Sequence, residues 1–185
     1  VLINEDILKI DEKKYSDKPM IVFGNLPYNI STQILIKWIR YKNLNHIFKK
    51  FILMFQKEVA ERIIAETNTK NYGRLSVLSS WKLNIKKILD VSPNSFYPIP
   101  KVKSSVLLIE PKQEYFTIKN SKNLELITNI FFNKRRKMIK KPLKEIFKDV
   151  VEISKKLNIN INDRPQNLSP SKYLEICREY EKLVF

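Results

Sequence analysis

The chain has 185 residues, of which 43% are hydrophobic, and a formal net charge of +16. This length and hydrophobic content are enough for one or two domains with their own cores, so a largely disordered chain is excluded. The single cysteine, Cys177, excludes a disulfide framework, and the single histidine, His46, argues against a His-based metal site or a Ser/His/Asp triad. We therefore expect no metal.

Nothing in the chain reads as a membrane segment. No apolar run approaches the about 20 residues of a membrane helix, and the start lacks the basic and apolar regions of a signal peptide. Cys177 lies in step with Tyr173 and Tyr180 on an expected helix, which predicts a buried core residue and not a reactive thiol. We expect a cytoplasmic protein without membrane contact.

The first part of the chain alternates strands and helices. Apolar runs bounded by turn residues are typical of strands buried on both faces, and the spacing of Ile34, Leu35, Trp38 and Ile39 is typical of an amphipathic helix that Ser31 can cap. The expected elements are strands at 1–3, 20–23 and 51–55 and helices at 31–39 and 57–65. The pattern is that of an α/β fold.

The second part begins in the same way and then becomes helical. We expect, in order, a helix at 72–81, strands at 85–91 and 102–109 around a Pro-rich loop at 95–101, and helices at 122–132, 138–148, 150–157 and 172–183. The sequence thus predicts an α/β catalytic domain at 1–112 and a small all-α domain at 113–185.

Positive charge is concentrated in the helical part. Residues 134–148 contain eight cations and one anion, whereas a solvated helix face normally mixes both signs. This density favours binding to the phosphate groups of a nucleic acid. The candidate RNA-binding residues are Lys101, Lys134, Arg135, Arg136, Lys137, Lys140 and Lys141.

The segment Gly24-Asn25-Leu26-Pro27-Tyr28 follows the expected strand at 20–23. Ligands of open α/β sheets bind just beyond the carboxyl ends of strands, and a glycine there lets the backbone approach a ligand. Asn25 and the Leu26 carbonyl supply two acceptors and Tyr28 an aromatic face, on a turn that Pro27 stiffens. Such a set suits a planar exocyclic amine.

Six motifs give the chain a resemblance to a known family. They are GNLPYNIST at 24–32, QKEV at 56–59, YGRLS at 72–76, FYPIPKV at 96–102, FNKRRK at 132–137 and NLSP at 167–170. In this order they resemble the bacterial small-subunit rRNA adenine dimethyltransferases, the KsgA family. The resemblance spans nearly the whole chain.

The resemblance implies a Rossmann-like methyltransferase sheet followed by a helical rRNA-binding domain. It implies transfer of methyl groups from S-adenosylmethionine to N6 of two adjacent adenines near the 3′ end of 16S rRNA, in an immature small ribosomal subunit, by a monomeric enzyme. The catalytic residues would be Asn25, Leu26, Pro27, Tyr28 and Phe96. Tyr28 and Phe96 would stack on the extruded base.

The cofactor site is only partly represented. By resemblance, Asp6 would contact the cofactor's adenine amine, the Ile7 backbone its ring, and Asn25 the methyl-transfer end. Gly24 and Gly73 are the only glycines, so the Gly-rich loop of this fold is absent. We expect the chain to be the carboxyl-terminal two-thirds of the enzyme and inactive by itself.

Three alternatives stay open at this point. The first is a 23S rRNA adenine methyltransferase of the erythromycin-resistance type, which shares an Asn-X-Pro-Tyr motif. The second is a non-catalytic rRNA-binding module. The third is a DNA or protein-glutamine methyltransferase, against which Leu26 and the basic helical tail argue.

Overall fold

The computed structural model describes residues 2–184, and these form two compact units. One unit comprises the chain up to residue 64 together with residues 82–114, and the other comprises residues 65–81 together with the chain from residue 115 onward. The units follow the expected ranges 1–112 and 113–185 except for residues 65–81, which group with the carboxyl-terminal helices.

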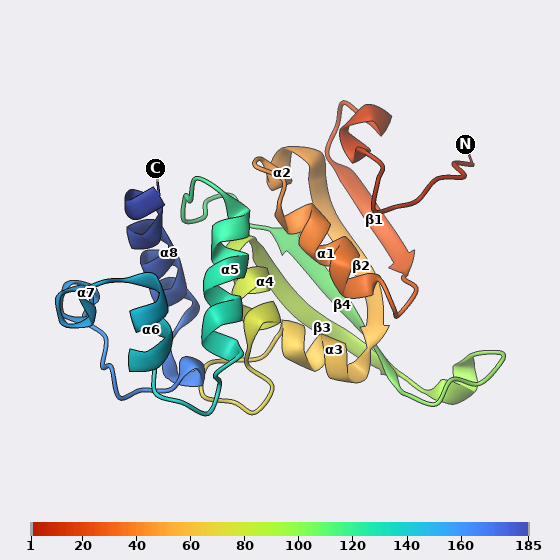
Figure 1. Ribbon diagram of the computed structural model, residues 1–185. Helices are drawn as coiled ribbons and strands as arrows, with labels where there is room; N and C mark the ends of the chain where they lie inside the picture. The colour runs from red at the N-terminus through yellow and green to blue at the C-terminus, as the bar shows by residue number, and fades with distance from the viewer. Residues whose placement is uncertain (1, 185) are drawn as a thin grey trace. The chain divides into compact units, whose positions relative to one another are not determined.

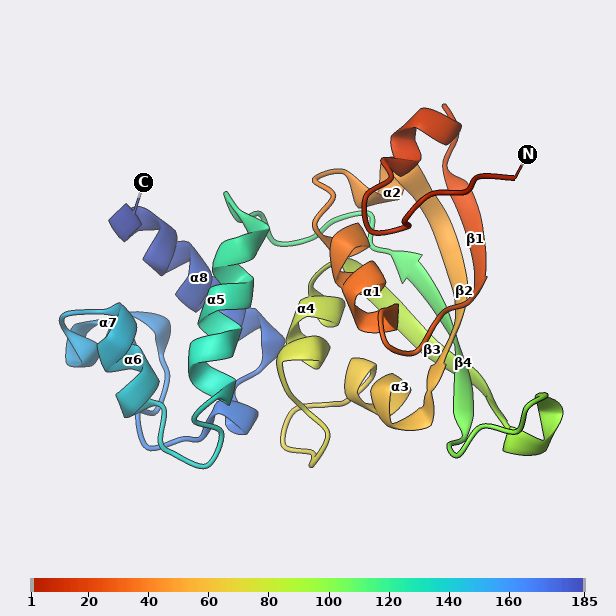
Figure 2. The same ribbon diagram turned by 45° about the vertical axis from the view of Figure 1, so that its right-hand side comes forward.

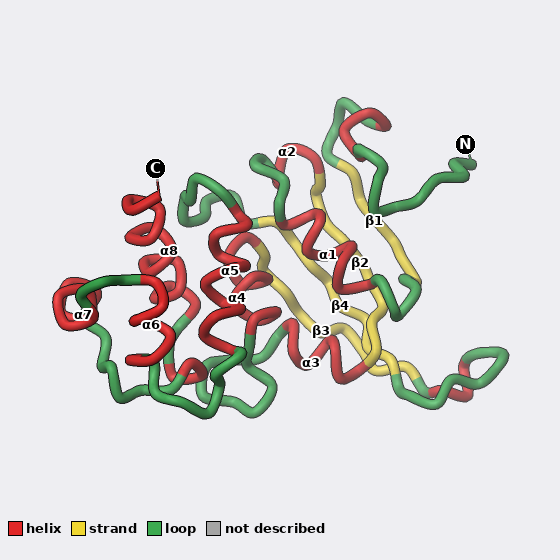
Figure 3. The backbone as a smooth tube through the Cα atoms, viewed as in Figure 1, coloured by secondary structure: helices red, strands yellow, loops and turns green. Residues whose placement is uncertain are grey.

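A four-stranded mixed sheet forms the centre of the first unit, as Figures 1 and 3 show. Its strands are β1 (Met20–Asn25), β2 (Phe48–Gln56), β3 (Leu83–Val91) and β4 (Ser104–Pro111). The spatial order is β1-β2-β4-β3, with β1 and β2 parallel and β4 antiparallel to both of its neighbours. The predicted α/β class is confirmed.

Helices cover one face of this sheet. These are α1 (Ser31–Ile39), the short α2 (Leu44–Ile47) and α3 (Lys57–Ile63), and Figure 2 shows α1 and α3 on the same side of the strands. The buried stripe of α1 carries Trp38, whose ring stacks on Phe51 of β2 with centroids 4.9 Å apart. Phe51, Leu53 and Phe55 alternate along β2 toward these helices and are fully buried.

The opposite face of β1 is open within residues 2–184. Ile21 and Phe23 alternate with half-buried neighbours along this edge strand, and Phe23 is 72% exposed. Two short 3-10 turns, Glu12–Tyr15 and Pro93–Ser95, complete the unit.

Two local predictions were wrong. Leu2 and Ile3 belong to no strand and are exposed, because no neighbouring strand pairs with them; Val1, the first residue of the expected strand, lies outside the described residues. Ser31 is the first residue of α1 and not its cap, since its hydroxyl donates to the Tyr28 carbonyl at 3.2 Å.

The second unit is helical. Its elements are α4 (Arg74–Lys82), α5 (Ser121–Phe132), α6 (Lys140–Ile146), α7 (Val150–Leu157), a 3-10 turn (Pro165–Asn167) and α8 (Pro170–Val184). Asp149 caps α7 by accepting from the Val151 and Glu152 amides, and Asn158 ends it in the left-handed conformation at φ 48°. The helix predicted at 138–148 is shorter at both ends, because Ile139 is its N-cap and Phe147, its C-cap, has extended backbone.

An aromatic cluster holds the helical unit together. The rings of Phe131 and Phe132 contact Tyr173 at 5.4 and 5.5 Å between centroids, and Tyr72 packs edge-on against Phe132. Cys177 is fully buried, and burial raises the pKa of its thiol to about 12, so the predicted core role is confirmed. No helix formed by residues 2–184 is long and apolar enough to cross a membrane.

Candidate active site

The loop after β1 presents two free acceptors. Within it, the Pro27 carbonyl accepts from the Ile30 amide at 3.1 Å and the Tyr28 carbonyl accepts from the Ser31 hydroxyl. Among residues 2–184, neither the Leu26 carbonyl nor the exposed Asn25 side chain has a partner. The internal bonds fix the turn and leave these two acceptors for a ligand.

Gly24 has a packing role in this loop. A Cβ at this position would meet the Leu26 side chain at 3.0 Å and the Leu53 side chain at 3.1 Å. The expectation that Gly24 makes room for a ligand is therefore replaced: the space is filled by Leu26 packing toward β2. This packing holds the Leu26 backbone in place.

A pocket of about 320 Å³ lies between this loop and the Pro-rich loop that connects β3 to β4. Asn25, Leu26, Pro27 and Tyr28 line one side, and Phe96, Tyr97, Pro98 and Pro100 line the other. The structure thus brings together all five residues predicted as catalytic. Two acceptors and three aromatic rings in one pocket, those of Tyr28, Phe96 and Tyr97, suit a planar base that carries an amino group.

Polar contacts support the rims of this pocket. The Tyr28 hydroxyl lies 2.6 Å from the buried Ser104 hydroxyl. Next to it, Asp90 accepts from Ser105 at 2.6 Å and from Lys57 at 3.0 Å, and these hydrogen bonds hold the pKa of Asp90 well below its ordinary value. The base of the Pro-rich loop is therefore tied to both β3 and α3.

The Pro-rich loop extends beyond the end of the sheet, as Figures 1 and 2 show. It contains a cis peptide bond between Tyr97 and Pro98, and Tyr97 is fully exposed. Lys101, the predicted RNA-binding residue of this unit, is exposed on the same loop. A cation beside the pocket is well placed to meet a phosphate group.

The segment that carries Asp6 and Ile7 is a turn without regular structure. Asp6 Oδ1 accepts from the Leu8 amide at 2.9 Å, and its carbonyl accepts from the Lys9 and Ile10 amides at 2.8 and 3.2 Å. Asp6 Oδ2 has only the exposed Lys9 ammonium at 4.0 Å, and the Ile7 amide donates to no group of residues 2–184. A carboxylate oxygen with only an exposed, distant ion pair and the backbone N–H of the next residue are thus available to a ligand.

The Asp6 carboxylate and the Ile7 N–H can be compared with the hydrogen-bonding groups of the adenine in S-adenosylmethionine. An adenine edge offers an amino donor beside a ring-nitrogen acceptor, which is the complement of a carboxylate oxygen beside an amide N–H. Asp6 and Ile7 therefore fit the adenine end of S-adenosylmethionine. The described residues contain no cluster of His, Cys, Asp and Glu that could hold a metal ion.

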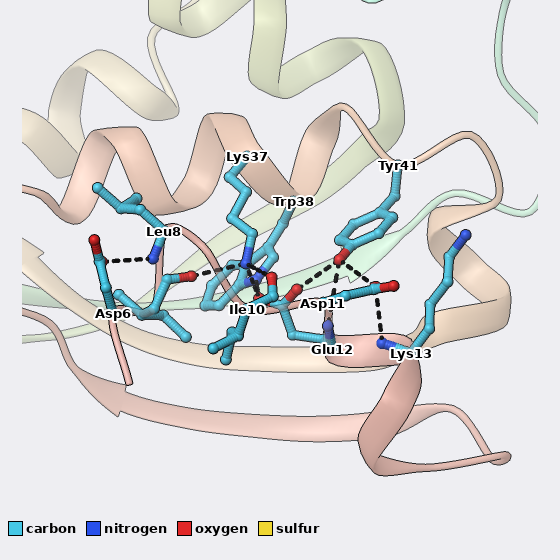
Figure 4. A network of polar contacts seen from close by, with 10 residues as sticks. Asp6, Leu8, Ile10, Asp11, Glu12, Lys13, Lys37, Trp38 and Tyr41 are labelled. Carbon is cyan, nitrogen blue, oxygen red and sulfur yellow. Dashed lines mark hydrogen bonds and ion pairs between the residues drawn. The ribbon is translucent and has the colours of Figure 1, made fainter. Parts of the chain in front are cut away.

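A network of polar contacts joins this segment to α1 (Figure 4). Lys37 donates to the Ile7 carbonyl, the Ile10 carbonyl and Glu12 Oε1 at 2.7, 2.6 and 2.7 Å. Glu12, only 6% exposed, also accepts from Trp38 Nε1 and the Tyr41 hydroxyl, each at 2.6 Å. Burial raises the pKa of Glu12, but the hydrogen bonds from Lys37, Tyr41 and Trp38 outweigh it and lower the pKa.

The basic residues of the helical unit differ in their surroundings. Arg135 donates to the Thr69 and Lys70 carbonyls and to Gln166, and Lys134 forms an ion pair with Glu145. The other predicted RNA-binding residues of this unit are exposed: Arg136, Lys137, Lys140 and Lys141. The structure thus separates two bonded cations from four that face solvent.

The sequence-based prediction missed the supporting residues of the site. Ser104 and Glu12 carry no local signal, since one is a serine in a strand and the other an acid in a charged segment. Lys37 does carry one: it interrupts the apolar run Ile34-Leu35-Ile36 and Trp38 on α1, where a lone cation needs partners.

Comparison with known proteins agrees with these features. Residues 1–182 match the family described as Ribosomal RNA adenine dimethylase. The chain is 57% identical over 182 residues to the "Ribosomal RNA small subunit methyltransferase A" of Pelagibacter ubique (strain HTCC1062), covering 98% of this chain and 70% of that protein. It is 46% identical over 176 residues to the protein of the same name from Ehrlichia ruminantium (strain Gardel), covering 95% and 66%.

Solved structures give the same result for the fold. A dimethyladenosine transferase from Plasmodium falciparum superposes with a TM-score of 0.80 at 25% identity, covering 97% of this chain and 72% of that one. The 23S rRNA methyltransferase ErmE superposes with a TM-score of 0.63 at 19% identity, covering 99% and 71%. The predicted Rossmann-like methyltransferase fold is confirmed.

The chain spans about two-thirds of the length of the curated relatives it matches, from 70% to 66% in the two compared above. Over that span the match includes both units and every motif of the pocket. The chain belongs to the ribosomal RNA adenine dimethylase family.

Proposed function

We propose that this protein transfers methyl groups from S-adenosylmethionine to N6 of two adjacent adenines near the 3′ end of 16S rRNA, in an immature small ribosomal subunit in the cytoplasm. The observation that carries the proposal is the pair of free acceptors, Asn25 and the Leu26 carbonyl, in a pocket with Tyr28 and Phe96. Family membership supports methyl transfer to rRNA adenine.

The two acceptors explain how such a site activates a weak nucleophile. The lone pair of an adenine amine is delocalised into the ring, so the amine attacks poorly while its hydrogens lie in the ring plane. Asn25 Oδ1 and the Leu26 carbonyl accept those two hydrogens and favour a localised lone pair. This is catalysis by positioning and electrostatics, and it requires no strong base.

The cofactor supplies an electrophilic methyl group on a sulfonium. Asp6 and Ile7 would hold the adenine of the cofactor. Asn25, the last residue of β1, would lie beside the methyl group that is transferred. Tyr28 and Phe96 would hold the extruded target base between aromatic faces. The exposed cations Lys101, Arg136, Lys137, Lys140 and Lys141 would bind rRNA phosphates, with the helical unit as the main RNA-binding part.

The small subunit is favoured over the 23S alternative. The relatives that match at 57% and 46% identity carry the small-subunit name, whereas the likeness to the 23S enzyme, at 19% identity, reflects the fold. Small subunits that lack the modification should therefore accept methyl groups from the full-length protein, and protein-free 23S rRNA should not.

The test of the catalytic role uses Asn25→Ala in the full-length protein, with Asn29→Ala as the matched control. Asn29 is exposed on the same loop and lines no part of the pocket. We expect Asn25→Ala to lower methyl transfer by about 100-fold or more while RNA affinity stays within about twofold. Equal losses of methyl transfer and RNA binding in Asn25→Ala would show instead that Asn25 maintains the fold. A wild type that binds RNA fully but transfers no methyl group would favour the non-catalytic rRNA-binding module.

A further inference from the structure

Helix α1 connects the two ends of the proposed site. Its first turn follows directly on the acceptor loop, and Lys37 and Trp38 in its last turns contact the segment that contains Asp6. Lys37 lies six positions after Ser31, which is about 9 Å along a helix. One rigid element therefore reaches both the target-base pocket and the proposed adenine-binding turn.

All three N–H groups of the Lys37 ammonium are hydrogen-bonded in this contact. An ammonium group has three protons, and Lys37 donates one each to Ile7, Ile10 and Glu12, at 2.6 to 2.7 Å. Its side chain is 18% exposed and that of Glu12 is 8% exposed, so these are charge-assisted bonds shielded from water. Such bonds hold a backbone more firmly than surface ion pairs do.

The turn at residues 6–10 depends on this anchor. Its remaining hydrogen bonds are local, because Asp6 accepts from Leu8, Lys9 and Ile10 within the turn itself. Lys37 donates to two carbonyls of the turn, those of Ile7 and Ile10, and Figure 4 shows its Nζ joined by dashed lines to Ile10 and Glu12. The bond to Ile7 fixes the peptide group next to the free Ile7 amide.

We propose that Lys37 is a positioning residue for cofactor binding: it fixes the turn at residues 6–10 so that the Asp6 carboxylate and the Ile7 amide face the adenine together. The inference rests on the proposed function for the identity of the ligand. It adds that Lys37 joins the proposed adenine-binding turn to α1, the helix that follows the acceptor loop.

The test compares Lys37→Met, Lys37→Arg and the control Lys14→Met in the full-length protein. Lys14 is exposed on the 3-10 turn that follows, so its replacement changes the net charge equally without touching the network. A fourth protein, Lys37→Met with Glu12→Gln, removes the charge that would otherwise be buried alone while keeping an acceptor for Trp38 and Tyr41. It distinguishes loss of positioning from loss of folding.

Two readouts are needed, one of them without cofactor. In the apoprotein, hydrogen exchange at the Lys9 and Ile10 amides should become about tenfold faster in both Lys37→Met proteins. Calorimetry should show S-adenosylmethionine affinity about tenfold weaker, with kcat and the KM for RNA little changed, and Lys37→Arg should recover most of the affinity.

The outcomes separate the two proposals. Wild type that fails to bind S-adenosylmethionine overturns the proposed function and this inference with it. If the wild type binds S-adenosylmethionine but Lys37→Met shows the same amide hydrogen exchange and the same cofactor affinity, only the positioning role is overturned. A fall in kcat equal to the loss of affinity, or an equal effect of Lys14→Met, would overturn it too.

Discussion

The hydroxyl oxygens of Tyr28 and Ser104 lie 2.6 Å apart, across 76 residues of sequence. Tyr28 belongs to the acceptor loop after β1, and Ser104 is the first residue of β4, directly after the Pro-rich loop. The bond therefore joins the two loops that form the pocket. It also fixes the tilt of the Tyr28 ring, on which the target base is proposed to stack.

We expect Ser104→Ala to lower kcat for methyl transfer by roughly fivefold to tenfold, because the ring loses its only side-chain anchor within residues 2–184. Tyr28→Phe should have a similar effect, since it keeps the ring and loses the same bond. The double variant should be no worse than either single one, with a coupling of about 1 kcal/mol. Additive losses in this double-mutant cycle would contradict the shared role.

Arg135 and Arg136 are adjacent but should respond differently to replacement by Met. Arg135 ties the carbonyls of residues 69 and 70 to Gln166, so its loss should lower the free energy of unfolding by about 1–2 kcal/mol. Arg136 is exposed and has no partner among residues 2–184, so Arg136→Met should leave stability within about 0.5 kcal/mol of the wild type.

For RNA binding we expect the opposite order, with a larger effect of replacing Arg136 than of replacing Arg135. Arg136→Met should weaken binding to the small subunit and reduce the slope of log affinity against log salt by about one, because one phosphate contact and its counterions are lost. Chemical denaturation and binding at several salt concentrations check both parts. A salt slope equal to that of the wild type would leave Arg136 as a merely solvated cation.

Lys82 gives a prediction on pH. It is 3% exposed and donates to the Tyr41 carbonyl at 2.7 Å, and burial lowers its pKa from 10.5 to about 8. Between these two values the unfolded chain keeps a proton on Lys82 that the folded chain has released. The contribution of Lys82 to the free energy of unfolding is therefore unfavourable below pH 8 and improves as the pH rises.

Lys82→Met should consequently be more stable relative to the wild type at pH 7 than at pH 10. We expect the difference between the two free energies of unfolding to change by roughly 2–3 kcal/mol over this interval. Urea unfolding at several pH values measures it, with Lys86→Met, an exposed site on β3, as control. Parallel stability curves for Lys82→Met and the wild type would refute the depressed pKa.

Local patterns in the sequence were enough for most elements and for the side of the pocket formed by the loop after β1. The period of Ile34, Leu35, Trp38 and Ile39 gave the buried face of α1, and the sheet geometry placed Asn25 to Tyr28 at a strand end. Phe96 could be assigned to the same pocket by resemblance alone, since 67 residues and two further strands lie between Tyr28 and Phe96.

Contacts between distant segments could not be predicted. Glu12 and Lys37 are 25 residues apart, and nothing in either neighbourhood specifies the partner. Leu2 and Ile3 suit a strand by residue type, but a strand also needs a neighbour to bond with. Residues 65–81 read as a continuation of the α/β part, and only their contacts with distant residues such as Phe132, Arg135 and Leu168 assign them to the helical unit.

Those contacts bear on how the protein is made. The Tyr72 hydroxyl donates to the Leu168 carbonyl, 96 residues further along the chain, and Asn68 accepts from Asn167 across 99 residues. At 5–20 residues per second, Asn68 and Tyr72 are synthesised about 5 to 20 seconds before Asn167 and Leu168 exist. During that interval Tyr72, Val77 and Trp81, all buried in the finished protein, have no completed core to enter. A nascent chain stalled before residue 165 would lack the partners of Asn68 and Tyr72 at residues 167 and 168, so we expect this segment to be accessible to chaperones during translation.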